Sequence, residues 1–166
     1  MVLWPADPMR RLEVFFAEDG AETVTFVRLG EKSRWRVADL GLGDSLARVQ
    51  ALNGRPFTFW GFSWDYGGYV SDWAGGRLQR LPGGCTLSLR FEVADGRTLD
   101  DAFVGDTAVS SDDPGVHALA AHVDEIGLGF HRPGPANEKG GPGVPRTALR
   151  MVSGRKSRPR SLYRRK

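Results

Sequence analysis

Several features that would identify a particular class of protein are missing from this sequence. It contains one cysteine, Cys85, which excludes an internal disulfide and a metal site built from several cysteines. It has no run of about 18 apolar residues, so we expect no membrane-spanning helix. The first residues, MVLWPADPMRRLE, lack the basic segment followed by an apolar stretch that is typical of a signal peptide.

Motifs for the commoner kinds of catalysis are also missing. The glycines come in pairs and do not form a phosphate-binding or dinucleotide-binding loop. Ser110 and Ser111 lack the G-x-S-x-G pattern of a nucleophile elbow. The pairs Asp100-Asp101 and Asp112-Asp113 are candidates for acid–base or metal chemistry, but they also suit turns and helix caps. We therefore predict no catalytic residue, no metal site and no cofactor.

Charge is divided unevenly along the chain. Residues 1–131 contain 12 Lys/Arg and 19 Asp/Glu, a balance of −7. Residues 132–166 contain 11 Lys/Arg and one acid, a balance of +10, and are rich in proline and glycine. This division predicts an N-terminal extension over 1–10, an acidic folded domain over 11–131 and a disordered basic tail over 132–166.

The first half of the domain alternates between strand and helix patterns. RLEVFFAEDG (11–20) and ETVTFVRLG (22–30) predict a hairpin, and SRWRVADL (33–40) predicts a weaker third strand. GDSLARVQALNGRP (43–56) then shows helical spacing, with Asp44 as the expected N-cap, Gly54 at the C-terminal end and Pro56 just beyond.

The second half predicts mainly strands. Glycine pairs at 67–68, 75–76 and 83–84 indicate hairpin turns, and CTLSLRFEV (85–93) alternates between apolar and polar residues. SDDPGVHALAAHV (111–123) predicts a second helix capped by Asp113, and 124–130 a last strand. The predicted fold class is α+β: an antiparallel meander of Gly-Gly hairpins packed by two short helices.

An aromatic segment raises the main functional question. GFSWDYGGYVSDWAGG (61–76) contains five aromatic residues. If Gly67-Gly68 is a two-residue turn, Tyr66 lies opposite Tyr69, and the aromatic residues share one face of the hairpin. That face is either part of the core or a platform for a sugar, a peptide or another flat ligand. The residues that would bind such a ligand are Asp65, Tyr66, Tyr69, Asp72 and Trp73.

The basic tail offers a second possible interaction. Its positive charges could neutralise phosphates on nucleic acid, meet an anionic membrane surface or another anionic polymer, or fold back on the acidic domain. No recognised nucleic-acid-binding fold accompanies the tail, so we expect such binding to be non-specific. The candidate residues are Arg155, Lys156, Arg158, Arg160, Arg164, Arg165 and Lys166.

The aromatic segment and the helix before it also carry a resemblance. Residues 40–130 resemble a family of uncharacterised bacterial proteins with the signature NG-x-PF-x(3)-GF-x-WDYGG. The segment 43–56 is more loosely similar to small outer-membrane assembly lipoproteins and to β-lactamase-inhibitor-like domains. In this sequence the signature reads Asn53-Gly54-Arg55-Pro56-Phe57, Gly61-Phe62 and Trp64-Asp65-Tyr66-Gly67-Gly68.

The second resemblance implies an α+β domain that acts by binding other proteins, and both point to the bacterial envelope. The leading hypothesis is therefore a non-enzymatic interaction module that binds a protein or small ligand. The alternatives are a nucleic-acid-associated protein and a hydrolase that uses Asp65 or Asp72. We expect an envelope or secreted location if the natural start lies upstream of Met1, and a cytoplasmic location otherwise.

Overall fold

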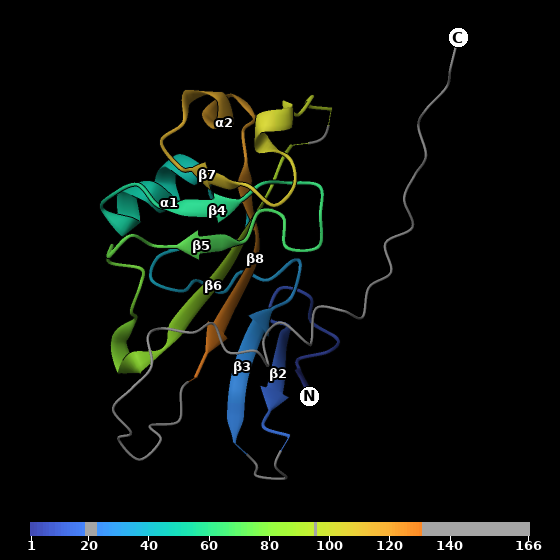
Figure 1. The fold of residues 1–166 in the computed structure, drawn as a ribbon. Coiled ribbons are helices and arrows are strands. Elements are labelled where there is room, and N and C mark those ends of the chain that lie inside the picture. The colour runs from blue at the N-terminus through green and yellow to red at the C-terminus, as the bar shows by residue number, and fades with distance from the viewer. Residues whose placement is uncertain (19–22, 95, 131–166) are drawn as a thin grey trace. The chain divides into compact units, whose positions relative to one another are not determined.

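The computed structural model describes residues 1–18, 23–94 and 96–130, and it has an α+β fold (Figure 1). Five strands form one sheet in the order β1-β2-β3-β8-β6, and three form another in the order β5-β4-β7. The strand pairs within both sheets are antiparallel, which confirms the predicted fold class. The strands are β1 (Val2–Leu3), β2 (Leu12–Phe16), β3 (Val24–Leu29), β4 (Thr58–Trp60), β5 (Val70–Asp72), β6 (Thr86–Glu92), β7 (Ala108–Ser110) and β8 (His122–Gly129).

Two short α-helices complete the fold, as predicted. They are α1 (Leu46–Asn53) and α2 (Pro114–Ala118), and short 3-10 helices cover Pro82–Gly84 and Asp101–Phe103. In Figure 1 both α-helices lie near the three-stranded sheet, whereas β2 and β3 lie at the opposite end. Among the described residues, no helix has the length and apolar character needed to cross a membrane.

Helix α1 begins one residue later than predicted. Its N-cap is Ser45, whose hydroxyl accepts a hydrogen bond from the amide of Arg48 at 3.3 Å. Asp44 instead accepts from the amide of Gly41 and pairs with the guanidinium of Arg48 at 3.2 Å. Gly54 ends the helix with a φ of 81°, because this left-handed conformation carries little steric cost for glycine.

Helix α2 is shorter than its apolar pattern predicted. Asp113 caps it by accepting from the amide of Gly115 at 2.7 Å, and Pro114 takes the first helical position, both as predicted. The helix ends at Ala118, and the positive φ of 52° at Ala120 turns the chain away from it. His122 and the residues after it therefore belong to β8.

The core lies between the inner face of the five-stranded sheet and the elements around α1, β4 and α2. Phe57, Phe59 and Phe91 are almost fully buried there, with 5.5 Å between the ring centroids of Phe59 and Phe91. In β6, Leu87 and Leu89 are buried with Phe91, which confirms the alternation seen in the sequence.

Three predictions about the chain path differ from the structure. Residues 33–40 form no strand; Val37 and Leu40 make one bridge around a tight turn in which Ala38 and Asp39 have positive φ angles. Residues 1–10, expected as an extension, contribute β1, and the Met1 amino group donates to the carbonyl of Val14 at 2.7 Å. Gly75-Gly76 and Gly83-Gly84 lie between β5 and β6, which belong to different sheets, so neither pair forms a hairpin turn.

Candidate functional site

The aromatic segment forms a long loop rather than the predicted two-residue hairpin. Strands β4 and β5 pair with Thr58 opposite Asp72 and Phe59 opposite Val70, so residues 61–69 form the connection between them. The amide of Trp60 donates to the carbonyl of Tyr69 at 2.9 Å and closes this loop. The amide of Tyr69 does donate to the carbonyl of Tyr66 at 3.3 Å across Gly67-Gly68, so the predicted turn is present, but the strand pairing expected to continue from it is wrong.

Gly68 also brings the loop into contact with β6. Its φ is 78°, and a Cβ at this position would lie 2.0 Å from the carbonyl oxygen of Phe91. The amide of Phe91 donates to the carbonyl of Gly68 at 2.9 Å, and Tyr69 bridges Arg90 as an antiparallel partner. The glycine thus lets the loop dock against β6, which connects the two sheets.

Part of the aromatic segment is core. Phe62 and Trp73 are only 3% and 8% exposed, and the Trp73 ring lies 5.1 Å from that of Phe57. This placement agrees with the interpretation of the aromatic residues as core, and it removes Trp73 from any exposed platform.

Three further rings form a partly exposed cluster on the loop and at the end of β4. Trp64 packs nearly perpendicular to Trp60 at 6.2 Å and to Tyr66 at 5.2 Å between ring centroids. The indole N–H of Trp64 donates to the carbonyl of Gly61 at 2.8 Å and holds the ring in place. All three rings are half-buried, and Asp65 between two of them is exposed. We call Trp60, Trp64 and Tyr66 the loop cluster.

Tyr69, at the end of the loop, faces the outer side of the five-stranded sheet. Its hydroxyl donates to Glu125 on β8 at 2.9 Å, and the guanidinium of Arg90 lies 5.7 Å from its ring centroid. Arg28 on β3 approaches Glu125 at 3.6 Å and also pairs with Glu13 on β2. Tyr69 is therefore part of a charged network across four strands and not a free ligand-binding group.

An irregularity in β8 gathers the acidic side of this network. The register between β6 and β8 shifts between Arg90 and Phe91, so that Asp124 has no Cα partner on β6. Arg90 pairs with Asp124 through its guanidinium, while Tyr69 bonds to the adjacent Glu125. A bulge of this kind redirects side chains, and here it lets two consecutive carboxylates serve one network.

The network shifts the pKa values of its members, including Tyr69 and Glu13. Burial raises the pKa of the Tyr69 hydroxyl above its usual range, and the neighbouring Glu125 carboxylate raises it further. The hydrogen bond from Arg28 lowers the pKa of Glu13, against a smaller opposing effect of burial. Tyr69 is therefore a hydrogen-bond donor at neutral pH, and Glu13 is a carboxylate.

The two aspartates proposed as alternatives for a hydrolase are both exposed to solvent. Asp72 accepts from the amide of Ala74 at 2.8 Å within a turn, and its side chain, like that of Asp65, is exposed. Exposure and a turn hydrogen bond favour local structural roles for these carboxylates over acid–base chemistry.

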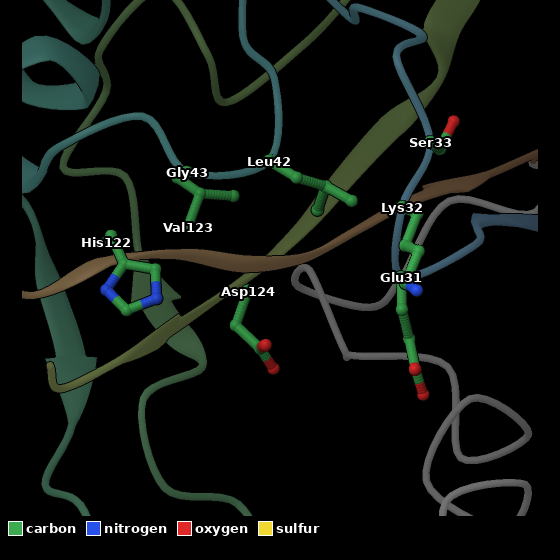
Figure 2. Close-up of a pocket in the computed structure, with 8 residues that line it drawn as sticks. All are labelled: Glu31, Lys32, Ser33, Leu42, Gly43, His122, Val123 and Asp124. Atoms are coloured by element: carbon green, nitrogen blue, oxygen red, sulfur yellow. The ribbon is translucent and has the colours of Figure 1, made fainter. Parts of the chain in front are cut away.

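A hollow of about 390 Å³ lies elsewhere, between the start of β8 and the segment after β3. Figure 2 shows His122 and Asp124 on one side of it, and Glu31 and Lys32 on the other. Across the part of the chain that the structure describes, no three His, Cys, Asp or Glu residues are grouped so that they could hold a metal ion. The hollow therefore has mixed charge but no metal-ligand set.

The structure also shows an aromatic surface that the sequence pattern did not indicate. Trp4 and Trp35 lie with their ring centroids 5.9 Å apart and are 38% and 42% exposed. The guanidinium of Arg10 stands 4.7 Å from the Trp4 ring centroid, and the indole N–H of Trp35 donates to the Arg10 carbonyl at 3.0 Å. We call the surface formed by Trp4, Met9, Arg10, Arg34 and Trp35 the N-terminal patch.

The signature residues of the proposed bacterial family have mostly structural roles here. The buried Asn53 donates from its side-chain amide to the carbonyls of Arg55 and Trp73 and accepts from the amide of Leu78. Gly54 ends α1, and the other signature glycines allow close backbone approaches. The signature positions that stay at least partly exposed on the loop are Trp64, Asp65, Tyr66 and Gly67.

Comparisons with family models, with curated proteins and with solved structures find no match. The family resemblance therefore stays a prediction. The proposed nucleic-acid-binding residues of the tail, from Arg155 to Lys166, lie outside the described residues, as does the predicted tail over 132–166.

Proposed function

We propose that this protein is a non-enzymatic binding module that holds a protein or small ligand against the loop cluster, with Asp65 as a hydrogen-bond acceptor. In this proposal Tyr66 and Trp64 supply apolar and aromatic contact area, and the carboxylate orients the ligand. Aromatic side chains suit this role because they bury a large area while losing few rotatable bonds. The envelope location implied by the resemblance is part of the same proposal.

The observation that carries this proposal is the fixed conformation of the loop. Gly68 is held against β6 by the hydrogen bond from Phe91, and Trp64 is held by its bond to Gly61. The half-exposed rings are thus positioned before any ligand arrives. Such preorganisation reduces the entropy lost on binding and so favours affinity.

Arrays of glycans and of peptides would test the proposal with the full chain. We expect that some array members bind the wild type, and that the same members bind the Tyr66→Ala and Asp65→Asn variants at least about tenfold more weakly. Phe130→Ala and Asp106→Asn are matched controls, since both residues are exposed and lie outside the loop. The controls should bind like the wild type.

Thermal unfolding of each variant separates binding from folding. The proposal requires that Tyr66→Ala and Asp65→Asn keep a melting temperature close to that of the wild type. If both variants bind every array member as the wild type does, the loop cluster is not the binding site. If Tyr66→Ala unfolds while Asp65→Asn binds normally, the rings are core residues and the proposal fails.

A further inference from the structure

The N-terminal patch differs in charge from the rest of the described domain. Residues 1–11 and 31–36 together contain five Lys/Arg and two Asp/Glu, whereas 1–131 as a whole contain 12 Lys/Arg and 19 Asp/Glu. Arg10 and Arg34 are exposed beside the two tryptophans. Trp, Met and Arg are the residue types enriched at protein–protein interfaces. The patch is therefore a basic, aromatic surface on an acidic domain, which favours an acidic partner.

The arrangement of the rings disfavours two kinds of partner. The guanidinium of Arg10 lies over the Trp4 ring and occupies a position where a nucleobase would stack. A second copy of the same patch would bring like charges together, and such a contact is repulsive. Neither nucleic acid nor self-association is thus favoured by this surface.

The edge strand beside the patch adds a backbone feature. Met1 and Val14 exchange two backbone hydrogen bonds, from the Val14 amide to the Met1 carbonyl and from the Met1 amino group to the Val14 carbonyl. In an antiparallel pair of strands, residues that exchange backbone hydrogen bonds with the neighbouring strand alternate with residues that make no backbone hydrogen bond to it. Val2, opposite Glu13, therefore directs its N–H and C=O away from β2, toward the edge of the sheet.

We propose that the N-terminal patch and the free edge of β1 together bind an extended acidic segment of a partner protein. The segment would pair its backbone with Val2, place apolar side chains on Trp4 and Trp35, and place carboxylates near Arg10 and Arg34. An extended peptide can bond to the exposed backbone groups of an edge strand, whereas lipid hydrocarbon cannot. Because β1 is two residues long, the side chains supply most of the affinity.

This inference is independent of the loop cluster and is tested on the same full chain. The probe is an array of heptapeptides that alternate Asp or Glu with Leu, Val or Phe, beside equally charged peptides in which serine replaces the apolar residues. The Trp35→Ala variant and the Arg10→Gln/Arg34→Gln double variant are compared with the wild type. Phe130→Ala and Arg97→Gln are the matched controls, and Tyr66→Ala shows whether the loop contributes.

We expect both patch variants to bind the alternating acidic peptides about tenfold or more weakly, with unchanged binding by the controls. N-methylation removes a backbone hydrogen-bond donor from the peptide. Methylating every second residue of the best peptide should weaken binding when the methylated residues face β1, and methylating the intervening residues should not. The charge variant keeps both rings, so it tests the patch even if Trp35→Ala fails to fold.

Two results would overturn the inference. One is that no peptide distinguishes the charge variant from the wild type. The other is that the wild type sediments with vesicles of 70% phosphatidylcholine and 30% phosphatidylglycerol, loses this binding in the charge variant, and ignores the peptides. That second result would assign the patch to an anionic membrane surface.

Discussion

Replacement of Gly68 by alanine tests the contact that connects the loop to β6. An alanine at this position takes a left-handed conformation that costs about 1–2 kcal/mol for a residue with a Cβ. The added Cβ would also lie 2.0 Å from the Phe91 carbonyl oxygen, so the loop must move. Movement breaks the hydrogen bond between the Phe91 amide and the Gly68 carbonyl, and loss of a buried hydrogen bond costs about 1–3 kcal/mol.

The expected loss in the free energy of unfolding is therefore about 2–5 kcal/mol, measured by urea denaturation. Gly105→Ala is the matched control, because Gly105 has a φ of 82° and no atom within 4 Å of the added Cβ. The control should lose only the conformational part, about 1–2 kcal/mol. The difference between the two variants measures the contact with β6. Equal losses for Gly68→Ala and Gly105→Ala would show that the contact contributes nothing.

The charged network predicts opposite effects of pH at its two ends. Because the pKa of Tyr69 is raised in the folded state, its contribution to stability is present below a pH of about 10 and is lost at higher pH. Between pH 9 and the alkaline limit of the fold, the free energy of unfolding should thus fall less for Tyr69→Phe than for the wild type. Both are measured in buffers of about 0.1 M ionic strength. If the free energy of unfolding depends on pH in the same way for both proteins, the raised pKa of Tyr69 is contradicted. Because the pKa of Glu13 is lowered, its contribution is present above about 4.5 and is lost as the pH falls through the lowered value. In this pH range the free energy of unfolding should fall less steeply with decreasing pH for Glu13→Gln than for the wild type. An unchanged dependence on pH would show that other carboxylates cause the acid destabilisation.

Local patterns in the sequence were sufficient for the elements whose stabilising contacts are themselves local. The cap of α2 at Asp113, the left-handed Gly54 and the alternation of β6 depend on neighbours within a few residues, and all three were predicted correctly. The error at the start of α1 has a local cause as well. Two adjacent residues, Asp44 and Ser45, can both cap a helix, and ion pairing of Asp44 left the cap to Ser45.

Features that depend on distant contacts could not be predicted in this way. The Gly67-Gly68 pair indicates a tight turn, but only the position of Phe91 shows that Gly68 also allows a close backbone approach to β6. The N-terminal patch brings together Trp4 and Trp35, which are far apart in sequence. The alternation of Arg34, Trp35 and Arg36 predicts a strand, but these residues lie in an irregular segment and all three are exposed.

The separation of roles within the loop has a consequence for how such a protein can diverge. Gly61, Gly67 and Gly68 support the loop through backbone approaches that other residues would obstruct, whereas Asp65 is exposed and Tyr66 is half-exposed. Under the proposed function, substitutions at Asp65 and Tyr66 would change ligand specificity while the supporting glycines preserve the architecture. A lineage could therefore acquire new specificities on an unchanged frame, and a shared signature would then indicate a common scaffold rather than a common ligand.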